Sequence, residues 1–142
     1  MTSAFWDSSG FVKLLIEGPG RDLAVDAWNE ADRNVASRLT IPEVSAALAT
    51  ARRTGRLDAQ SDREARRRWA QYVRALELVE LAPAIGDRAA DLVVEHALSG
   101  ADAVHLASVL TLAAAEPVLI TWDRRLAAAA HAAGIVVVPE PT

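Results

Sequence analysis

Short apolar segments alternate with amphipathic helical segments along this 142-residue chain, and this alternation restricts the possible folds more than any other feature. The apolar segments have the length of buried strands; they are residues 3–7, 34–38, 78–81, 117–121 and 135–138. Parallel strands need crossover connections, which helices usually supply. We therefore predict an α/β fold in which helices cover both faces of a central parallel sheet.

The intervening segments repeat apolar residues at helical spacing. The clearest stripe is Trp69, Tyr72, Val73 and Leu76, which favours a core position for both aromatic rings over a base-stacking role. The predicted helices are residues 12–16, 22–32, 40–53, 61–76, 85–98, 101–115 and 123–133. Glycine or proline separates several of them.

Composition excludes several classes of chemistry. The sequence has no Cys, so disulfides, zinc–thiolate sites, iron–sulfur clusters and thiol nucleophiles are ruled out, as suits a reducing compartment. No apolar run approaches the roughly 18 residues of a membrane span, and the first residues lack the pattern of a targeting signal. We expect a soluble, cytoplasmic protein with no membrane association.

The charge is unevenly distributed. The net charge of −4 argues against a protein that coats nucleic acid by bulk attraction. One stretch is nevertheless locally basic, with seven arginines at Arg52, Arg53, Arg56, Arg63, Arg66, Arg67 and Arg68. These residues form either a solvated helix face or a surface that contacts an RNA backbone or a protein partner.

Four acidic residues occupy positions that a parallel sheet brings to one edge. Asp7 and Asp123 each end a predicted strand, while Glu43 and Asp102 lie in the first turns of predicted helices. Ligands of open parallel sheets bind beyond the carboxyl ends of the strands, where the following helices also begin. The four carboxylates are therefore candidates for a single site.

Helix capping is the competing interpretation of the same acids. Thr40 and Ser99 precede Glu43 and Asp102 by three residues, as in capping boxes, and Asp7 and Asp123 are themselves suitable N-caps. As a set, however, four converging carboxylates would repel one another unless a cation compensated them. The sequence alone leaves both roles open.

The donor set favours a particular metal. Carboxylate oxygens suit Mg²⁺ or Mn²⁺, and the absence of Cys and the shortage of His, of which there are only three, argue against zinc. Because Mg²⁺ takes a few carboxylates together with substrate phosphate, the set favours phosphodiester hydrolysis by a metal-activated water, with one or two ions.

The motifs resemble those of the PIN-domain ribonucleases, and especially the VapC-type toxins of toxin–antitoxin pairs. Four segments carry the resemblance, and their order and spacing are specific: FWDSS followed by VKL at residues 5–14, TIPEV at 40–44, GADAVHLA at 100–107 and LITWDRRL at 119–126. Two departures do not touch the acids: Gly10 stands where alanine is common, and Trp122 fills a variable position.

The resemblance implies a three-layer α/β/α sandwich, with residues 1–142 as a single PIN-like nuclease domain. It implies that Asp7, Glu43, Asp102 and Asp123 are the acidic quartet that binds Mg²⁺ or Mn²⁺ and cleaves RNA. It also implies a homodimer and a cognate antitoxin whose C-terminal segment occupies the active-site groove.

Supporting roles are less sharply indicated. Ser8 or Ser9, together with Thr121, has a hydroxyl placed to orient a carboxylate, and Arg124 or Arg125 is placed to contact phosphate. The further candidates are Lys13, for which a solvated surface position is favoured, and His105, which shares a helix face with Asp102 and is interpreted as a packed or hydrogen-bonded residue.

Two other functions remain open at this point. One is a PIN-type RNA-processing nuclease without an antitoxin. The other is a non-catalytic α/β interaction module, in which the acids serve only as helix caps.

Overall fold

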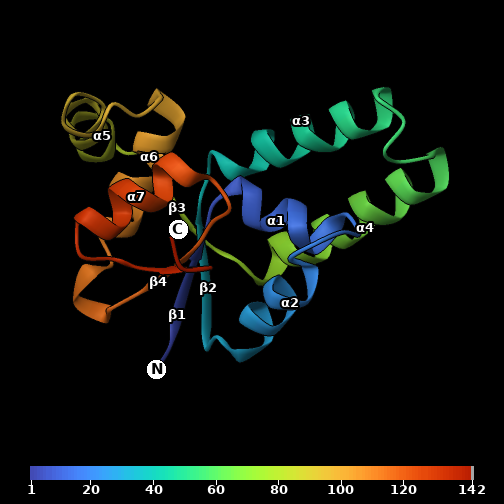
Figure 1. Ribbon diagram of the computed structural model, residues 1–142, viewed down its shortest axis with the longest axis horizontal. Coiled ribbons are helices and arrows are strands. Elements are labelled where there is room, and N and C mark those ends of the chain that lie inside the picture. Colours follow the sequence, from blue (N-terminus) through green and yellow to red (C-terminus); the bar gives the residue numbers. More distant parts are fainter. Residues whose placement is uncertain (142) are drawn as a thin grey trace.

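The computed structural model describes residues 1–141 and contains one five-stranded parallel sheet with strand order β3-β2-β1-β4-β5 (Figure 1). The strands are β1 (Ser3–Trp6), β2 (Arg33–Ser37), β3 (Glu77–Val79), β4 (Val118–Ile120) and β5 (Val136–Val138). All four pairs of neighbouring strands are parallel, which confirms the predicted sheet.

Helices cover both faces of this sheet, giving the expected three layers (Figure 1). One face carries α1 (Ser8–Leu15), α2 (Arg21–Glu30), α3 (Thr40–Arg53) and α4 (Ala59–Ala75), and the other carries α5 (Pro83–His96), α6 (Gly100–Leu110) and α7 (Arg124–Ala132). Within residues 1–141, none of the helices combines the length and the apolar character needed to span a bilayer.

Strand β1 is buried on both sides because it lies at the centre of the sheet. Its side chains alternate between the two cores: Phe5 packs among residues of α5, α6 and α7, whereas Ala4 and Trp6 pack beneath α1, α3 and α4. This two-residue period is the geometry of a strand. Every residue of β1 is buried, so its register, and with it the position of Asp7, is strongly specified.

The core under α1 is built around five aromatic rings, namely Trp6, Phe11, Trp28, Trp69 and Tyr72. Their paired centroids are between 4.7 and 6.2 Å apart, mostly in edge-on or tilted arrangements. The prediction that Trp69 and Tyr72 belong to the core is confirmed.

One predicted helix is too long. We expected residues 101–115 to be helical throughout, but α6 ends at Leu110 and a separate 3₁₀ turn follows at Ala113–Ala115. Thr111 ends the α-helix, because its backbone N–H and its hydroxyl both donate to the carbonyl of Ser108. Such i to i−3 bonds tighten the last turn and stop its propagation.

Gly10 lies where α1 approaches the sheet most closely. A Cβ placed on it would lie 2.8 Å from Cε3 of Trp6 and 3.1 Å from the carbonyl oxygen of Ile120. The large indole of Trp6 therefore leaves no room for a side chain larger than that of glycine at this position. We expect Gly10→Ala to lower the free energy of unfolding by about 1–3 kcal/mol through overpacking, measured by denaturant unfolding.

Gly86→Ala is the matched control for this substitution. Gly86 also lies within a helix, α5, but a Cβ on it would have no neighbour within 4 Å. This substitution is expected to raise the free energy of unfolding by roughly 0.5–1 kcal/mol, the ordinary advantage of alanine in a helix. If both variants were stabilised alike, the close approach at Gly10 would not limit the size of that residue.

Candidate active site

Asp7 follows the last residue of β1 and is only 4% exposed. Its Oδ1 accepts hydrogen bonds from the Gly10 backbone N–H (3.0 Å) and the Ser9 hydroxyl (2.7 Å), and its Oδ2 accepts one from the Thr121 hydroxyl (2.6 Å). Thr121 is within reach because β4 pairs with β1 and both strands end at the same edge. Asp7 thus caps α1 and also joins two segments 114 residues apart.

Burial raises the pKa of Asp7 above its usual value. The hydrogen bonds from Thr121 and Ser9 lower this pKa but do not fully offset the loss of solvent. An ionised Asp7 is therefore costly in the metal-free protein, and a nearby cation would reduce that cost.

Asp123 and Asp102 lie near Asp7, Asp123 as the N-cap of α7 and Asp102 in the first turn of α6. Oδ1 of Asp123 accepts from the Leu126 N–H at 3.0 Å, whereas in α6 it is Ser99 that caps, accepting from the Asp102 N–H at 3.1 Å. Burial raises the pKa of Asp102, and the negative charges of Asp123 and Asp7 raise it further. The three aspartates therefore share one neighbourhood, and the capping interpretation is also correct for Asp7, Asp123 and Ser99.

Glu43 lies in the first turn of α3, but the predicted capping box there is wrong. The N-cap is Leu39, and Thr40 is already helical, with a buried hydroxyl that has no hydrogen-bond partner within residues 1–141. Glu43 instead turns toward α1 and α6, where its Oε1 lies 2.7 Å from the Ser8 hydroxyl and 2.6 Å from Nε2 of His105. Burial raises the pKa of Glu43, but these two contacts outweigh it, so the pKa is lowered overall.

The chemistry of these side chains fits a hard divalent cation. All four are carboxylates, and a cation would compensate the negative charges of Asp123 and Asp7, which add to burial in raising the pKa of Asp102. The metal site is not preformed, however. Within residues 1–141, no three Asp, Glu or His side chains are already arranged to hold an ion. Asp102 and Asp123 are only partly buried, so their side chains have room to turn.

Comparison with known proteins shows which family this chain belongs to. The sequence profile of the PIN domain matches residues 4–132. Two curated Mycobacterium tuberculosis proteins, Ribonuclease VapC45 (strain CDC 1551 / Oshkosh) and Ribonuclease VapC49 (strain ATCC 25618 / H37Rv), are each 44% identical to this chain over 139 residues, covering 98% of it and 96% of the relative. The chain belongs to the VapC-type PIN-domain ribonucleases.

Solved structures agree on the PIN fold. PAE2754 from Pyrobaculum aerophilum superposes with a TM-score of 0.68 at 24% identity, covering 96% of this chain and 91% of the other. VapC20 of M. tuberculosis, described as a sarcin–ricin loop cleaving toxin, gives 0.65 at 18% identity, covering 94% and 96%. At these identities the likeness concerns the fold alone.

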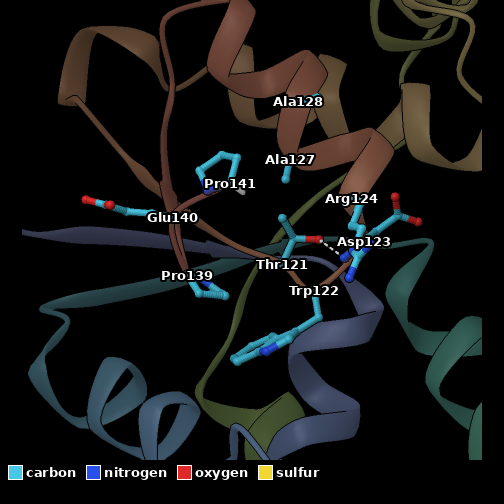
Figure 2. Close-up of a pocket in the computed structure, with 9 residues that line it drawn as sticks. All are labelled: Thr121, Trp122, Asp123, Arg124, Ala127, Ala128, Pro139, Glu140 and Pro141. Atoms are coloured by element: carbon cyan, nitrogen blue, oxygen red, sulfur yellow. Dashed lines mark hydrogen bonds between the residues drawn. The ribbon is translucent and has the colours of Figure 1, made fainter.

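Two hydroxyls connect the segments of this PIN site. Ser9 donates to Asp7 and accepts from the backbone N–H of Trp122 at 2.8 Å. Thr121 donates to Asp7 and accepts from the backbone N–H of Asp123 at 3.0 Å, the bond drawn in Figure 2. Each hydroxyl thereby fixes the end of β1 relative to the end of β4.

The basic candidates lie around the same edge of the PIN sheet. The ammonium of Lys13 is 5.7 Å from the centroid of the Trp122 ring, which also lies against Gly20. Arg124 begins α7, is exposed, and lines a hollow of about 270 Å³ together with Asp123 and Pro141 (Figure 2). Arg124 directly follows Asp123 in the chain, and Lys13 lies beside the ring of Trp122, which directly precedes Asp123.

The arginine-rich stretch lies on the arm formed by the end of α3, the turn after it and α4, which extends away from the sheet (Figure 1). Arg68, which is partly buried, donates to the backbone carbonyl of Leu14 and so fastens α4 to α1. Arg66 pairs with Asp62 within α4. Six of the seven side chains are exposed, namely Arg52, Arg53, Arg56, Arg63, Arg66 and Arg67.

The contact of His105 with Glu43 is the part of the PIN site that sequence reasoning missed. His105 was expected to be packed or hydrogen-bonded, which is confirmed, but its partner lies 62 residues away on another helix. The available signal was its i+3 spacing from Asp102, which places both residues on the same face of α6. Ser8 was considered only as a neighbour of Asp7, whereas it donates to Glu43.

Proposed function

We propose that this chain is a Mg²⁺-dependent endoribonuclease and the toxin of a type II toxin–antitoxin pair. The observation that carries the proposal is the gathering of Asp7, Asp102 and Asp123 at the carboxyl ends of β1 and β4, where burial and the negative charges of Asp123 and Asp7 raise the pKa of Asp102. Further support comes from the membership of this chain in the VapC-type ribonucleases, two of which match it over 98% of its length. PIN-domain nucleases of this type are metal-dependent.

In this proposal Asp7, Glu43, Asp102 and Asp123 hold the cation, with Mn²⁺ as the alternative to Mg²⁺. The bound ion would supply compensation of negative charge on the phosphate and make a nearby water more acidic. The protein's own contribution is placement: Ser9 and Thr121 hold Asp7, the Leu126 N–H holds one oxygen of Asp123, and the partly buried side chain of Asp102 faces both. Arg124 and Lys13 are proposed to contact the RNA phosphates flanking the cleaved bond.

The partners follow from the same assignment. We expect RNA as the substrate, a cognate antitoxin as the inhibitor, a homodimer as the working form, and the cytoplasm as the place of action, since RNA and antitoxin are made there. A small adjacent gene for a DNA-binding protein would support the toxin over an RNA-processing nuclease without an antitoxin. Co-purification of the two gene products in a stable complex is the corresponding measurement.

Cleavage of structured RNA by the purified chain is the direct test. With 5–10-fold excess RNA, we expect multiple turnovers in Mg²⁺ or Mn²⁺, none in EDTA, and none on duplex DNA of the same sequence. Mapping the product ends would define the cleavage position. A folded native chain that cleaves no RNA with either metal, and binds neither metal, would favour the non-catalytic interaction module.

A further inference from the structure

His105 is a buried polar residue in the middle of α6. It is 2% exposed, and its Nε2 lies 2.6 Å from Oε1 of Glu43. Asp102 lies three residues earlier on the same helix face. The imidazole therefore contacts one of the acids proposed to hold the cation and shares a helix face with another, while its own helix is packed against the sheet through Leu106 and Val109.

The hydrogen bonds to the carboxylate of Glu43 involve only one of its two oxygens. Its side chain is 30% exposed, and every hydrogen bond that residues 1–141 make to its carboxylate goes to Oε1, from Ser8 and from His105. A glutamate has three rotatable side-chain bonds, so with no partner it would sample many orientations toward solvent. Two donors on one oxygen fix the carboxylate and leave Oε2 available.

The imidazole is suited to this contact by its other nitrogen. Nδ1 of His105 is buried and has no hydrogen-bond partner within the described residues, so the ring proton is best placed on Nε2, the atom that faces Glu43. An N–H donor of this kind orients a carboxylate without forming the bidentate ion pair that an arginine would form. The negative charge of Glu43 then remains available for a cation.

We propose that His105 is a positioning residue that holds Glu43 so that Oε2 faces the divalent cation. The inference rests on the proposed function, because it assumes that Glu43 is one of the ligands. The inference goes beyond the proposed function because it gives an orienting role to His105, a residue that would touch neither the cation nor the RNA. Partners of this kind, which hydrogen-bond to a ligand, typically change metal affinity 10–100-fold when they are removed.

Two amide substitutions of His105 test the positioning role, because they differ in how far the side-chain nitrogen extends toward Glu43. The side-chain nitrogen of Gln in His105→Gln falls near the position of Nε2, whereas that of Asn in His105→Asn falls near Nδ1 and cannot reach Glu43. We expect His105→Gln to bind Mn²⁺ within about threefold of the native chain and His105→Asn to bind at least about tenfold more weakly, by titration calorimetry. In cleavage assays, His105→Asn should raise the Mn²⁺ concentration for half-maximal rate and change kcat at saturating Mn²⁺ much less.

The Glu43→Gln background separates positioning from packing. If His105 acts through Glu43, adding His105→Asn to Glu43→Gln should change Mn²⁺ affinity less than about twofold. His131→Leu, which removes an exposed histidine from α7, controls for the loss of an adventitious imidazole ligand and should bind as the native chain does. Should His105→Asn fail to fold, Ser8→Ala removes the second donor to Oε1 and is expected to weaken Mn²⁺ binding in the same direction.

These measurements distinguish a failure of the positioning role from a failure of the metal site. Equal Mn²⁺ affinities of His105→Asn, His105→Gln and the native chain would overturn the positioning role while leaving the proposed nuclease intact. Equal weakening by His105→Asn with and without Glu43 would also overturn it, because the effect would not pass through that carboxylate. A native chain that binds no Mn²⁺ would overturn the metal site itself, and this inference with it.

Discussion

Replacing Asp7 or Asp102 with Asn is expected to lower Mg²⁺-dependent RNA cleavage by at least about 100-fold. Asn preserves the size of each side chain but removes one negative charge from the neighbourhood of Asp123. A cation that stabilises charge at phosphorus is worth several kcal/mol in the transition state, and each 1.36 kcal/mol is about tenfold in rate. Initial rates on one structured RNA, compared with the native chain at the same Mg²⁺ concentration, measure the effect.

Asp87→Asn is the matched control for charge removal. Asp87 is exposed on α5 and, within residues 1–141, makes no hydrogen bond or ion pair with any of the four acids, so its loss is expected to leave the rate unchanged. Circular dichroism establishes that each variant is folded before its rate is interpreted. Native rates in both Asp7→Asn and Asp102→Asn would end the assignment of these acids to catalysis.

Asp102→Asn is also expected to change stability in opposite directions with and without Mg²⁺. Burial and the charges of Asp123 and Asp7 raise the pKa of Asp102 in the folded, metal-free chain. The folded chain then holds its proton more tightly than the unfolded chain does. The free energy of unfolding therefore falls as pH rises from the ordinary pKa through the raised one, and it stays lower above that window.

At pH 7 the metal-free variant should thus be the more stable protein. The gain is expected to be no more than about 1 kcal/mol, because solvent screens a half-exposed carboxylate. At pH 3 the two proteins should differ little, since Asp102 is then protonated. Thermal unfolding in EDTA at both pH values measures this difference.

Mg²⁺ should reverse the order. An ion present at about 100 times its dissociation constant stabilises a folded protein by roughly 2.7 kcal/mol, and the variant with a weakened site should gain much less. The native chain is therefore expected to become the more stable protein in Mg²⁺. If Mg²⁺ raised the unfolding temperatures of both proteins equally, Asp102 would not be a ligand.

The sequence predicts most of the fold because its periodicity matches the structure, although the helix predicted at residues 12–16 begins earlier, at Ser8, where Asp7 caps it. Residues 40–53 were expected to be helical and form α3 with the same bounds, and each predicted strand is present within two residues of its expected ends. The error at residues 101–115 has a local cause, the hydrogen bonds that Thr111 makes to Ser108. An alanine-rich stretch after it gives no signal of that end.

The sequence predicts which acids belong to the candidate site, but it does not predict the contacts that these acids make. That Asp7 and Asp123 lie at one edge follows from strand topology, which the sequence pattern indicates. The contact of Glu43 with His105 depends on how α3 and α6 approach each other across the sheet edge, and no local pattern encodes that approach. The Thr40 capping box failed for a related reason, since a sequence match cannot tell whether a hydroxyl faces the helix end or the core.

The pairing of β1 with β4 has a consequence during synthesis. Strand β1, which Asp7 follows directly, is synthesised more than 100 residues before its neighbour β4, and Thr121 and Asp123 come with β4. An incomplete nascent chain therefore lacks part of the acid cluster. Nuclease activity during translation thus has to wait until both segments have emerged from the ribosome.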